Sequence, residues 1–363
     1  MSRFGYAPLV PALIGAGWFD PGAAGYLGAT NLAGYIAGAG LARRMSLFAA
    51  PRALMQASLA IATAGFIACA YPLGFWWYFG WRFASGVIGG VLMVLAAPAV
   101  LAIAPPALRG RIAGTVFTGV GTGIALSGTL VPWALRFGLP ATWWSLAIAS
   151  ALLGAFAWVA LPRGAPVRET AAPAVATSAR LTPAIALVAL AYAASAIGFV
   201  PHTVYWVDFV ARGLGRGVAA GGHQWVLLGV AAACGPLLAG LVADRIGFVR
   251  TFRWALLLQA VALILPIAST GGFALALSSI GTGALGIGSV SLASGRVAEL
   301  VPLEHQRQVW GWLTLAFSIA YAGMGYALAF VFARTGSYAI LFAIAAAALV
   351  AGAVIDMLAP RPA

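Results

Sequence analysis

Long apolar stretches, separated by short polar or glycine-containing segments, follow one another along almost the whole chain. An α-helix rises about 1.5 Å per residue, so about 20 apolar residues span the hydrocarbon core of a bilayer. The pattern predicts an all-α membrane protein with twelve transmembrane helices. Their expected ranges are residues 1–17, 23–42, 53–71, 78–103, 112–135, 142–161, 183–206, 217–243, 254–270, 272–295, 309–333 and 337–359.

The first stretch is the shortest of these helices. Residues 1–17 would rise about 24 Å, which is less than the hydrocarbon core of about 30 Å. The segment also lacks the apolar region followed by a small-residue cleavage site that marks a signal peptide. We therefore expect the natural chain to start upstream of Met1. An in-frame apolar extension in the genomic DNA would support this expectation.

The composition agrees with a membrane protein. Of the residues, 63% are hydrophobic and 7% are charged, whereas soluble domains carry about 25% charged residues. The formal net charge is +13, and all 20 basic residues are arginine. A basic chain can bind nucleic acid, but arginines at the ends of apolar stretches orient a membrane protein instead. We therefore expect a lipid bilayer, and no nucleic acid, as a partner.

Arginine content alternates from loop to loop. One side holds 14 arginines and the other holds 4. Because arginine-rich loops stay in the cytoplasm, this bias predicts that both termini are cytoplasmic and that the helix number is even. The richer set is Arg43, Arg44, Arg52, Arg109, Arg111, Arg163, Arg168, Arg180, Arg245, Arg250, Arg253, Arg296, Arg307 and Arg361; the poorer set is Arg136, Arg212, Arg216 and Arg334.

The longest polar segment lies near the middle of the chain. Residues 162–181 are rich in proline and alanine and poor in large apolar residues, which is typical of a flexible linker. The segment predicts two pseudo-symmetric six-helix bundles, residues 1–161 and 182–363, joined by a cytoplasmic linker. Internal repeats of this kind are common in secondary transporters.

A charged motif interrupts the second half. The sequence GLVADRIGFVR holds Gly240, Asp244, Arg245, Gly247 and Arg250. It resembles the cytoplasmic loop signature of the major facilitator superfamily, G-x-L-A-D-R-x-G-R-[KR]. The resemblance implies the major facilitator fold and a conformational latch at this loop; the alternative is a signal for topology alone.

The corresponding stretch of the first half runs from Gly38 to Arg52. It has Arg43 where the second half has Asp244. We therefore expect any charged latch to depend on Asp244.

A second superfamily pattern, R-x3-G-x3-G, is matched by Arg82, Gly86 and Gly90. Glycines four residues apart share a helix face and permit close approach of another helix. An arginine within a membrane helix must face a partner or a wet cavity. The alternative is that Arg82 extends to the membrane interface beside neighbouring tryptophans.

The N-terminal stretch SRFGYAPLVPAL resembles the first helix of the YbfB/YjiJ-type branch of the superfamily. The matching residues include Arg3, Tyr6, Pro8 and Pro11. The resemblance implies that Arg3 faces the central cavity and binds an anionic solute; the alternative is an arginine at the cytoplasmic edge. Tyr6, Asn31, Tyr35, Arg82 and Tyr205 complete the candidate substrate site.

Residues 183–206 and the segment after them contain the densest polar cluster. His202 and Asp208 are candidate proton carriers, because burial in a membrane shifts such groups toward titration near neutrality. The alternative is that Asp208 pairs with Arg212, four residues further on. Arg296 and Glu299, three residues apart, are expected to form a local ion pair.

The sequence therefore predicts a secondary transporter, without cofactors, that moves a small solute and is coupled to protons; Arg3 and Arg82 favour an anionic solute. Lysine is absent, so a nucleotide-binding Walker motif is excluded, and no catalytic or metal motif occurs. We expect a monomer in the bacterial plasma (inner) membrane. The alternative is a non-transporting membrane sensor or interaction subunit with the same fold; uptake and efflux are not distinguished.

Overall fold

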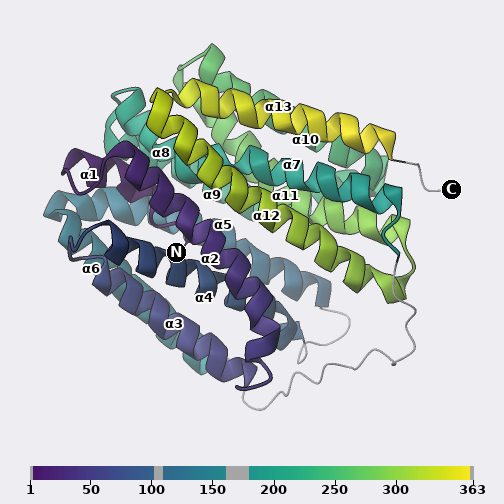
Figure 1. Cartoon of the computed structure of the whole chain (residues 1–363), viewed down its shortest axis with the longest axis horizontal. Coiled ribbons are helices and arrows are strands. Elements are labelled where there is room, and N and C mark those ends of the chain that lie inside the picture. Colours follow the sequence, from purple (N-terminus) through teal and green to yellow (C-terminus); the bar gives the residue numbers. More distant parts are fainter. Residues whose placement is uncertain (1–2, 102–108, 161–179, 360–363) are drawn as a thin grey trace.

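The computed structural model of the protein describes residues 3–101, 109–160 and 180–359. Long helices run roughly along one axis of the molecule (Figure 1). They are α2 (Pro21–Met45), α3 (Pro51–Ala68), α4 (Phe75–Leu101), α5 (Arg109–Ala134), α6 (Leu139–Ala160), α7 (Pro183–Val204), α9 (Gly217–Ile246), α10 (Phe248–Ala268), α11 (Gly272–Leu300), α12 (Leu303–Thr335) and α13 (Tyr338–Leu358). Short elements are η1 (Ala7–Leu9), α1 (Val10–Gly15), η3 (Leu135–Phe137), α8 (Trp206–Asp208) and η4 (Phe209–Gly213).

The all-helical prediction is confirmed over the described residues, but two segments differ from it. The first expected helix is a 3₁₀ turn followed by the six residues of α1, because Pro8 and Pro11 lack backbone donors and Gly17 turns the chain at φ 71°. Helix α7 ends at Val204, and the chain then continues through α8 and one turn of π-helix, η4.

Several helices also begin earlier in the structure than the sequence predicts. Helix α10 begins at Phe248 and α12 at Leu303, each six residues before the expected start. The apolar pattern detects the part of a helix that fits the membrane, whereas the backbone bonds continue into the polar flanks.

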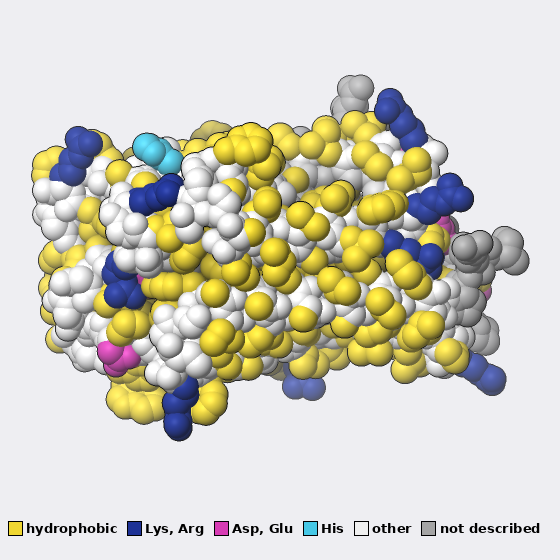
Figure 2. Space-filling model, turned by 90° about the horizontal axis from the view of Figure 1, so that it is seen from above, with side chains coloured by type: hydrophobic (Ala, Val, Ile, Leu, Met, Phe, Trp, Pro, Cys, Tyr) yellow, Lys and Arg dark blue, Asp and Glu magenta, His cyan; other side chains and the backbone are white. Residues whose placement is uncertain are grey.

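Eight of the helices that the structure describes are long and apolar enough to cross a membrane: α4, α6, α7, α9, α10, α11, α12 and α13. By this criterion the expected twelve spans are not confirmed over the described residues. Apolar side chains cover the flank of the molecule, and most arginines on the face shown lie toward its two ends (Figure 2). This surface belongs to a multi-pass membrane protein.

Helices α2 and α4 pack backbone to backbone. A Cβ atom on Gly86 would lie 2.1 Å from the carbonyl oxygen of Asn31, and one on Gly90 would lie 2.3 Å from that of Tyr35. The close approach predicted for these two glycines is thus confirmed. Helices α9 and α11 pack in the same manner, since a Cβ on Gly283 would lie 2.3 Å from the oxygen of Leu228.

Other contacts join the N-terminal and C-terminal helices. Helix α2 lies beside α12 (Figure 1), and the Tyr326 hydroxyl donates to Thr30 Oγ1 at 3.4 Å. Helix α5 lies against α9, where Trp225 Nε1 donates to Ser127 Oγ at 3.1 Å. At the end where α2 begins, called here the arginine-poor end, Gly22 packs against Ala333 of α12. The opposite end, where the described residues Arg44, Arg52, Arg245, Arg250 and Arg253 lie, is called the arginine-rich end.

We predict that Gly90→Ala lowers the melting temperature of the purified protein by several degrees, because overpacking a close contact costs about 1–3 kcal/mol. Gly80→Ala, on the same helix, is the matched control, since nothing lies within 4 Å of its added Cβ. Equal melting temperatures for the two variants in a thermal-shift assay would contradict the packing described.

Candidate functional site

A small cavity lies where the N-terminal segment meets α2, α4, α7 and α12. Its volume is about 20 Å³, which is room for about one water molecule. Among the described residues that line it, two are arginines and none is acidic. The lining residues are Arg3, Phe4, Tyr6, Ala7, Gly28, Asn31, Leu32, Arg82, Thr203, Val204 and Tyr321.

Arg82 reaches this cavity from α4 and is 5% exposed. Its guanidinium carbon lies 4.2 Å from the ring centroid of Tyr6, and its Nε donates to the Leu27 carbonyl oxygen at 3.4 Å. Tyr6 is fixed in turn, because its hydroxyl donates to the Ala24 carbonyl at 3.0 Å. The alternative in which Arg82 extends to the membrane interface is therefore wrong, because the side chain is held inside the bundle.

Arg3 enters the same cavity from the N-terminal segment. Its guanidinium carbon lies 4.6 Å from the ring centroid of Tyr35, 5.0 Å from that of Tyr321 and 5.1 Å from that of Phe4. Such cation–π contacts stabilise a cation, by up to about 2 kcal/mol when it is desolvated. Arg3 Nε is nevertheless buried without a hydrogen-bond partner in the described structure. A positively charged hydrogen-bond donor, Arg3 Nε, is therefore available to a ligand.

Three polar side chains complete the lining. Asn31, on α2, donates from Nδ2 to the Arg82 carbonyl oxygen at 3.1 Å. The Tyr321 hydroxyl, on α12, donates to Thr203 Oγ1 of α7 at 2.8 Å. Thr203 and Tyr321 were not among the residues expected from the sequence, because a single hydroxyl on an apolar helix is usually an ordinary interhelical contact.

The structure thus brings four of the expected substrate residues to one cavity: Arg3, Tyr6, Asn31 and Arg82. Tyr35 contacts this site through the guanidinium of Arg3. Tyr205 does not line the cavity. Its ring packs on Phe332 with centroids 5.1 Å apart, and its hydroxyl lies against Gly25 without a hydrogen-bond partner.

His202 faces away from the cavity, into the C-terminal helices. The ring is fully buried and stacks on Trp206 with centroids 4.3 Å apart. His202 Nε2 lies 2.9 Å from Ser278 Oγ, which donates its hydrogen to the Ala262 carbonyl oxygen at 2.6 Å. Nε2 must then donate to Ser278 Oγ, and Nδ1 is buried without a hydrogen-bond partner among the described residues.

Asp208 is already engaged. Its carboxylate accepts from Arg212 Nε at 2.5 Å and from the Tyr338 hydroxyl at 2.6 Å. The bond to Asp208 raises the pKa of the Arg212 guanidinium. The alternative in which Asp208 pairs with Arg212 is therefore the one that the structure shows.

A larger cavity of about 440 Å³ adjoins this pair at the arginine-poor end, between the start of α2, the end of α12 and the start of α13. It is lined by Asp20 and Arg212, among others. Its arginine is bound to Asp208, whereas the central cavity has unpartnered buried polar atoms. We therefore regard the smaller, central cavity as the better candidate for the solute site.

The charged motif lies at the arginine-rich end, at the junction of α9 and α10. Gly247 ends α9 with φ 85°, and the side chains of Asp244, Arg245 and Arg250 are exposed. The described structure gives Asp244 no hydrogen bond or ion pair. In this conformation the motif does not hold two helices together. The corresponding position in the first half, Arg43, lies among side chains outside the described set.

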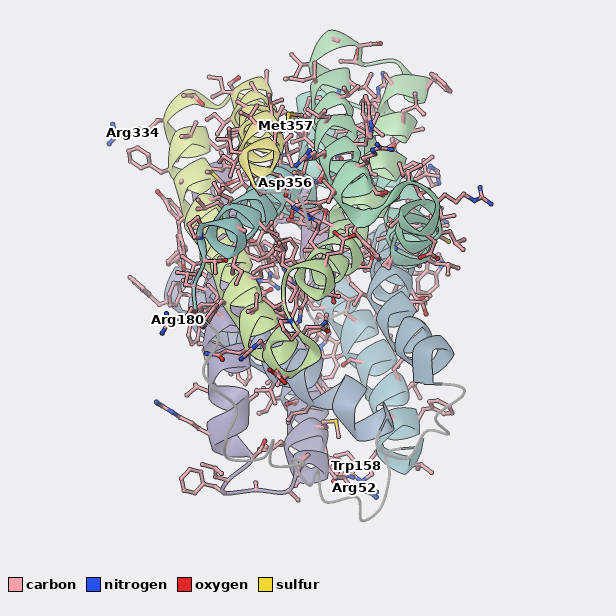
Figure 3. All side chains as sticks on the ribbon, turned by 90° about the vertical axis from the view of Figure 1, so that its right-hand side faces the viewer. Arg52, Trp158, Arg180, Arg334, Asp356 and Met357 are labelled. Carbon is pink, nitrogen blue, oxygen red and sulfur yellow. The ribbon has the colours of Figure 1, made fainter. Side chains whose placement is uncertain are left out.

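A buried ionic cluster lies at the same end, and the sequence predicted only one of its ion pairs. Arg296 pairs with Glu299 at 3.3 Å as expected, but it also bonds Asp356 at 3.3 Å. Arg253 bonds the other oxygen of Asp356 at 2.7 Å. Figure 3 shows Asp356 among the C-terminal helices, whereas Arg52 and Trp158 lie together at the far edge of the N-terminal ones. The cluster ties α10, α11 and α13 together.

Solved structures share the fold of this chain. The chain is similar to a D-xylose–proton symporter, with a TM-score of 0.80 and 16% identity over 99% of this chain and 94% of that one. It is also similar to a bacterial homologue of the human lysosomal transporter Spinster in an inward-facing, unoccupied conformation, with a TM-score of 0.71 and 14% identity over 99% and 91%. The chain therefore has the same fold as these two transporters.

The family can be stated more narrowly. Residues 1–357 match the family model described as "Uncharacterised MFS-type transporter YbfB", and the chain belongs to that family. It is a secondary transporter and not an enzyme. No curated protein matched the sequence.

Proposed function

We propose that this transporter moves a small anionic solute across the bacterial inner membrane by alternating access, and that the central cavity is its solute site. The observation that supports this most strongly is that Arg3 and Arg82 line the same cavity, whose described lining has no acidic residue. Positive charge inside a membrane is unfavourable unless a counter-charge or polar partner is present. Arg3 Nε is buried without a hydrogen-bond partner among the described residues, and an anionic solute supplies that partner.

Alternating access requires two bodies that move against each other around the site. We assign these bodies to residues 1–161 and 182–363, with 162–181 as the linker and both termini in the cytoplasm. Backbone-close packing joins α2 to α4 and α9 to α11 within the two bodies, and it also joins α5 to α9 between them. The cavity lies between them, with Arg82 on one side and Tyr321 on the other.

We further propose that His202 carries the coupled proton. Its Nδ1 is a buried acceptor without a partner, so a proton can be added there while Nε2 keeps its bond to Ser278. The next residue, Thr203, lines the solute cavity and bonds Tyr321. Protonation on one face of α7 can therefore influence the cavity on its other face. Asp208 is less suited to this role because Arg212 and Tyr338 occupy its carboxylate.

Asp244, Arg245 and Arg250, with the turn residues Gly240 and Gly247, are proposed to form the latch of the opposite state. The close contact of Gly22 with Ala333 supports closure of the arginine-poor end in this conformation. Asp244 is exposed and unpaired here, as expected for a latch that engages when the arginine-rich end closes.

We predict that Arg3→Gln reduces transport at least tenfold, because a hydrogen bond to a charged group contributes about 1.5–3 kcal/mol. Small carboxylates that stabilise the wild type in a thermal-shift panel are then used for counterflow in proteoliposomes. Arg334→Gln is the control, since Arg334 points away from the helices at the surface. Unchanged counterflow in Arg3→Gln would remove Arg3 from the site, and binding without any counterflow would indicate a sensor.

His202→Gln is expected to preserve exchange of the solute across the membrane but to abolish its accumulation driven by a pH gradient. The glutamine Nε2 can still donate to Ser278, but no titratable nitrogen remains. We predict that counterflow of the stabilising carboxylate persists, while its movement no longer responds to an imposed pH gradient. A variant that still follows the pH gradient as well as the wild type does would contradict the assignment of His202.

Asp244→Asn is expected to slow the exchange of states while leaving solute binding intact, because the latch loses its charge but the cavity is untouched. Counterflow rates and thermal-shift affinities measure the two properties separately. Glu304→Gln, an exposed acid at the same end, is the control. Wild-type rates in Asp244→Asn would reduce the motif to a signal for membrane orientation.

A further inference from the structure

One carbonyl oxygen in the central cavity has no donor. The side chain of Asn31 is 1% exposed, and its amide orientation is fixed because Nδ2 donates to the Arg82 carbonyl oxygen at 3.1 Å. That bond leaves Oδ1 as the second polar atom of the amide, and Oδ1 is buried without a hydrogen-bond partner. Buried polar atoms in proteins are normally paired, so an unpaired acceptor in a cavity indicates a missing donor.

The opposite polarity is presented by Arg3. Its Nε is a buried donor without a partner, and the guanidinium lies among three aromatic rings rather than beside a carboxylate in the described structure. The cavity therefore offers a positively charged hydrogen-bond donor, Arg3 Nε, and a neutral acceptor, Asn31 Oδ1, both without a partner among the described residues. Its volume of about 20 Å³ has room for about one water molecule.

We infer that the cavity selects carboxylates that also carry a neutral hydrogen-bond donor, of which the 2-hydroxy acids are the simplest class. The carboxylate meets the arginines, and the hydroxyl donates to Asn31 Oδ1. This inference rests on the proposed function of the cavity as the solute site.

The charge of the lining distinguishes a hydroxyl from an ammonium group. Both can donate to Asn31 Oδ1, but an ammonium group adds a third cation to a cavity that contains Arg3 and Arg82. None of the described lining residues is acidic, so nothing there compensates that charge. Amino acids are therefore expected to bind more weakly than the matching hydroxy acids.

Matched pairs of acids test the inference in the purified full-length protein. The pairs are glycolate and acetate, lactate and propionate, and malate and succinate, with alanine as the amino counterpart of lactate. Thermal shifts and titration calorimetry give the dissociation constants. We expect each hydroxy acid to bind about tenfold or more tightly than its partner, because the partner leaves the buried acceptor unpaired.

Asn31→Leu removes the acceptor with little change in volume, and it should reduce the preference for the hydroxy acid to less than about twofold. Thr30→Val, next to it on α2, is the matched control. Thr30 is also fully buried, but it bonds Tyr26 and Tyr326 and does not line the cavity. The preference should persist in that variant. If Asn31→Leu does not fold, the comparison of pairs in the wild type remains decisive.

The outcomes distinguish the preference for hydroxy acids from the existence of an anion site. Equal binding of both members of each pair to the wild type would overturn this inference and leave the anion site standing. A preference that survives in Asn31→Leu would also overturn it. If no carboxylate binds, the proposed function fails and the inference fails with it.

Discussion

Burial of two guanidinium groups near the middle of an apolar bundle is the constraint on which the rest of this structure depends. Arg82 is held by the ring of Tyr6 and the carbonyl of Leu27, and Arg3 by three aromatic rings. These contacts are polarisable or dipolar and carry no full negative charge. They hold the arginines in place, and an anion that enters the cavity is attracted by Arg3, whose Nε has no hydrogen-bond partner among the described residues.

The packing around the cavity fits a site that must open and close. Within each proposed half, glycines bring helix backbones into direct contact, as at Gly90 of α4 and Gly283 of α11. The buried cluster around Asp356 adds further ties among the C-terminal helices. Between the halves, α5 and α9 also approach backbone to backbone, since a Cβ on Gly121 would lie 2.4 Å from the carbonyl oxygen of Gly229, and Trp225 donates to Ser127 there. Rocking of the two halves as rigid bodies therefore has to shift this α5–α9 contact as well.

The sequence predicted the all-helical fold because apolar periodicity and length are strong signals, and it placed Arg3 and Arg82 as site candidates because charge is rare in membrane helices. It could not show that Arg82 avoids the interface, since burial depends on how α2 approaches α4. Thr203 and Tyr321 were missed because their chemistry is ordinary until the fold brings them beside Arg3. Asp356 lies 60 residues from its partner Arg296, a distance at which spacing gives no information.

The most direct measurement is a crystal structure of the protein with bromoacetate bound, in which the anomalous signal of bromine locates the carboxylate. The account predicts one peak in the central cavity, with the carboxylate in contact with the guanidinium groups of both Arg3 and Arg82. A peak in the larger cavity beside Arg212, with the central cavity empty, would contradict it.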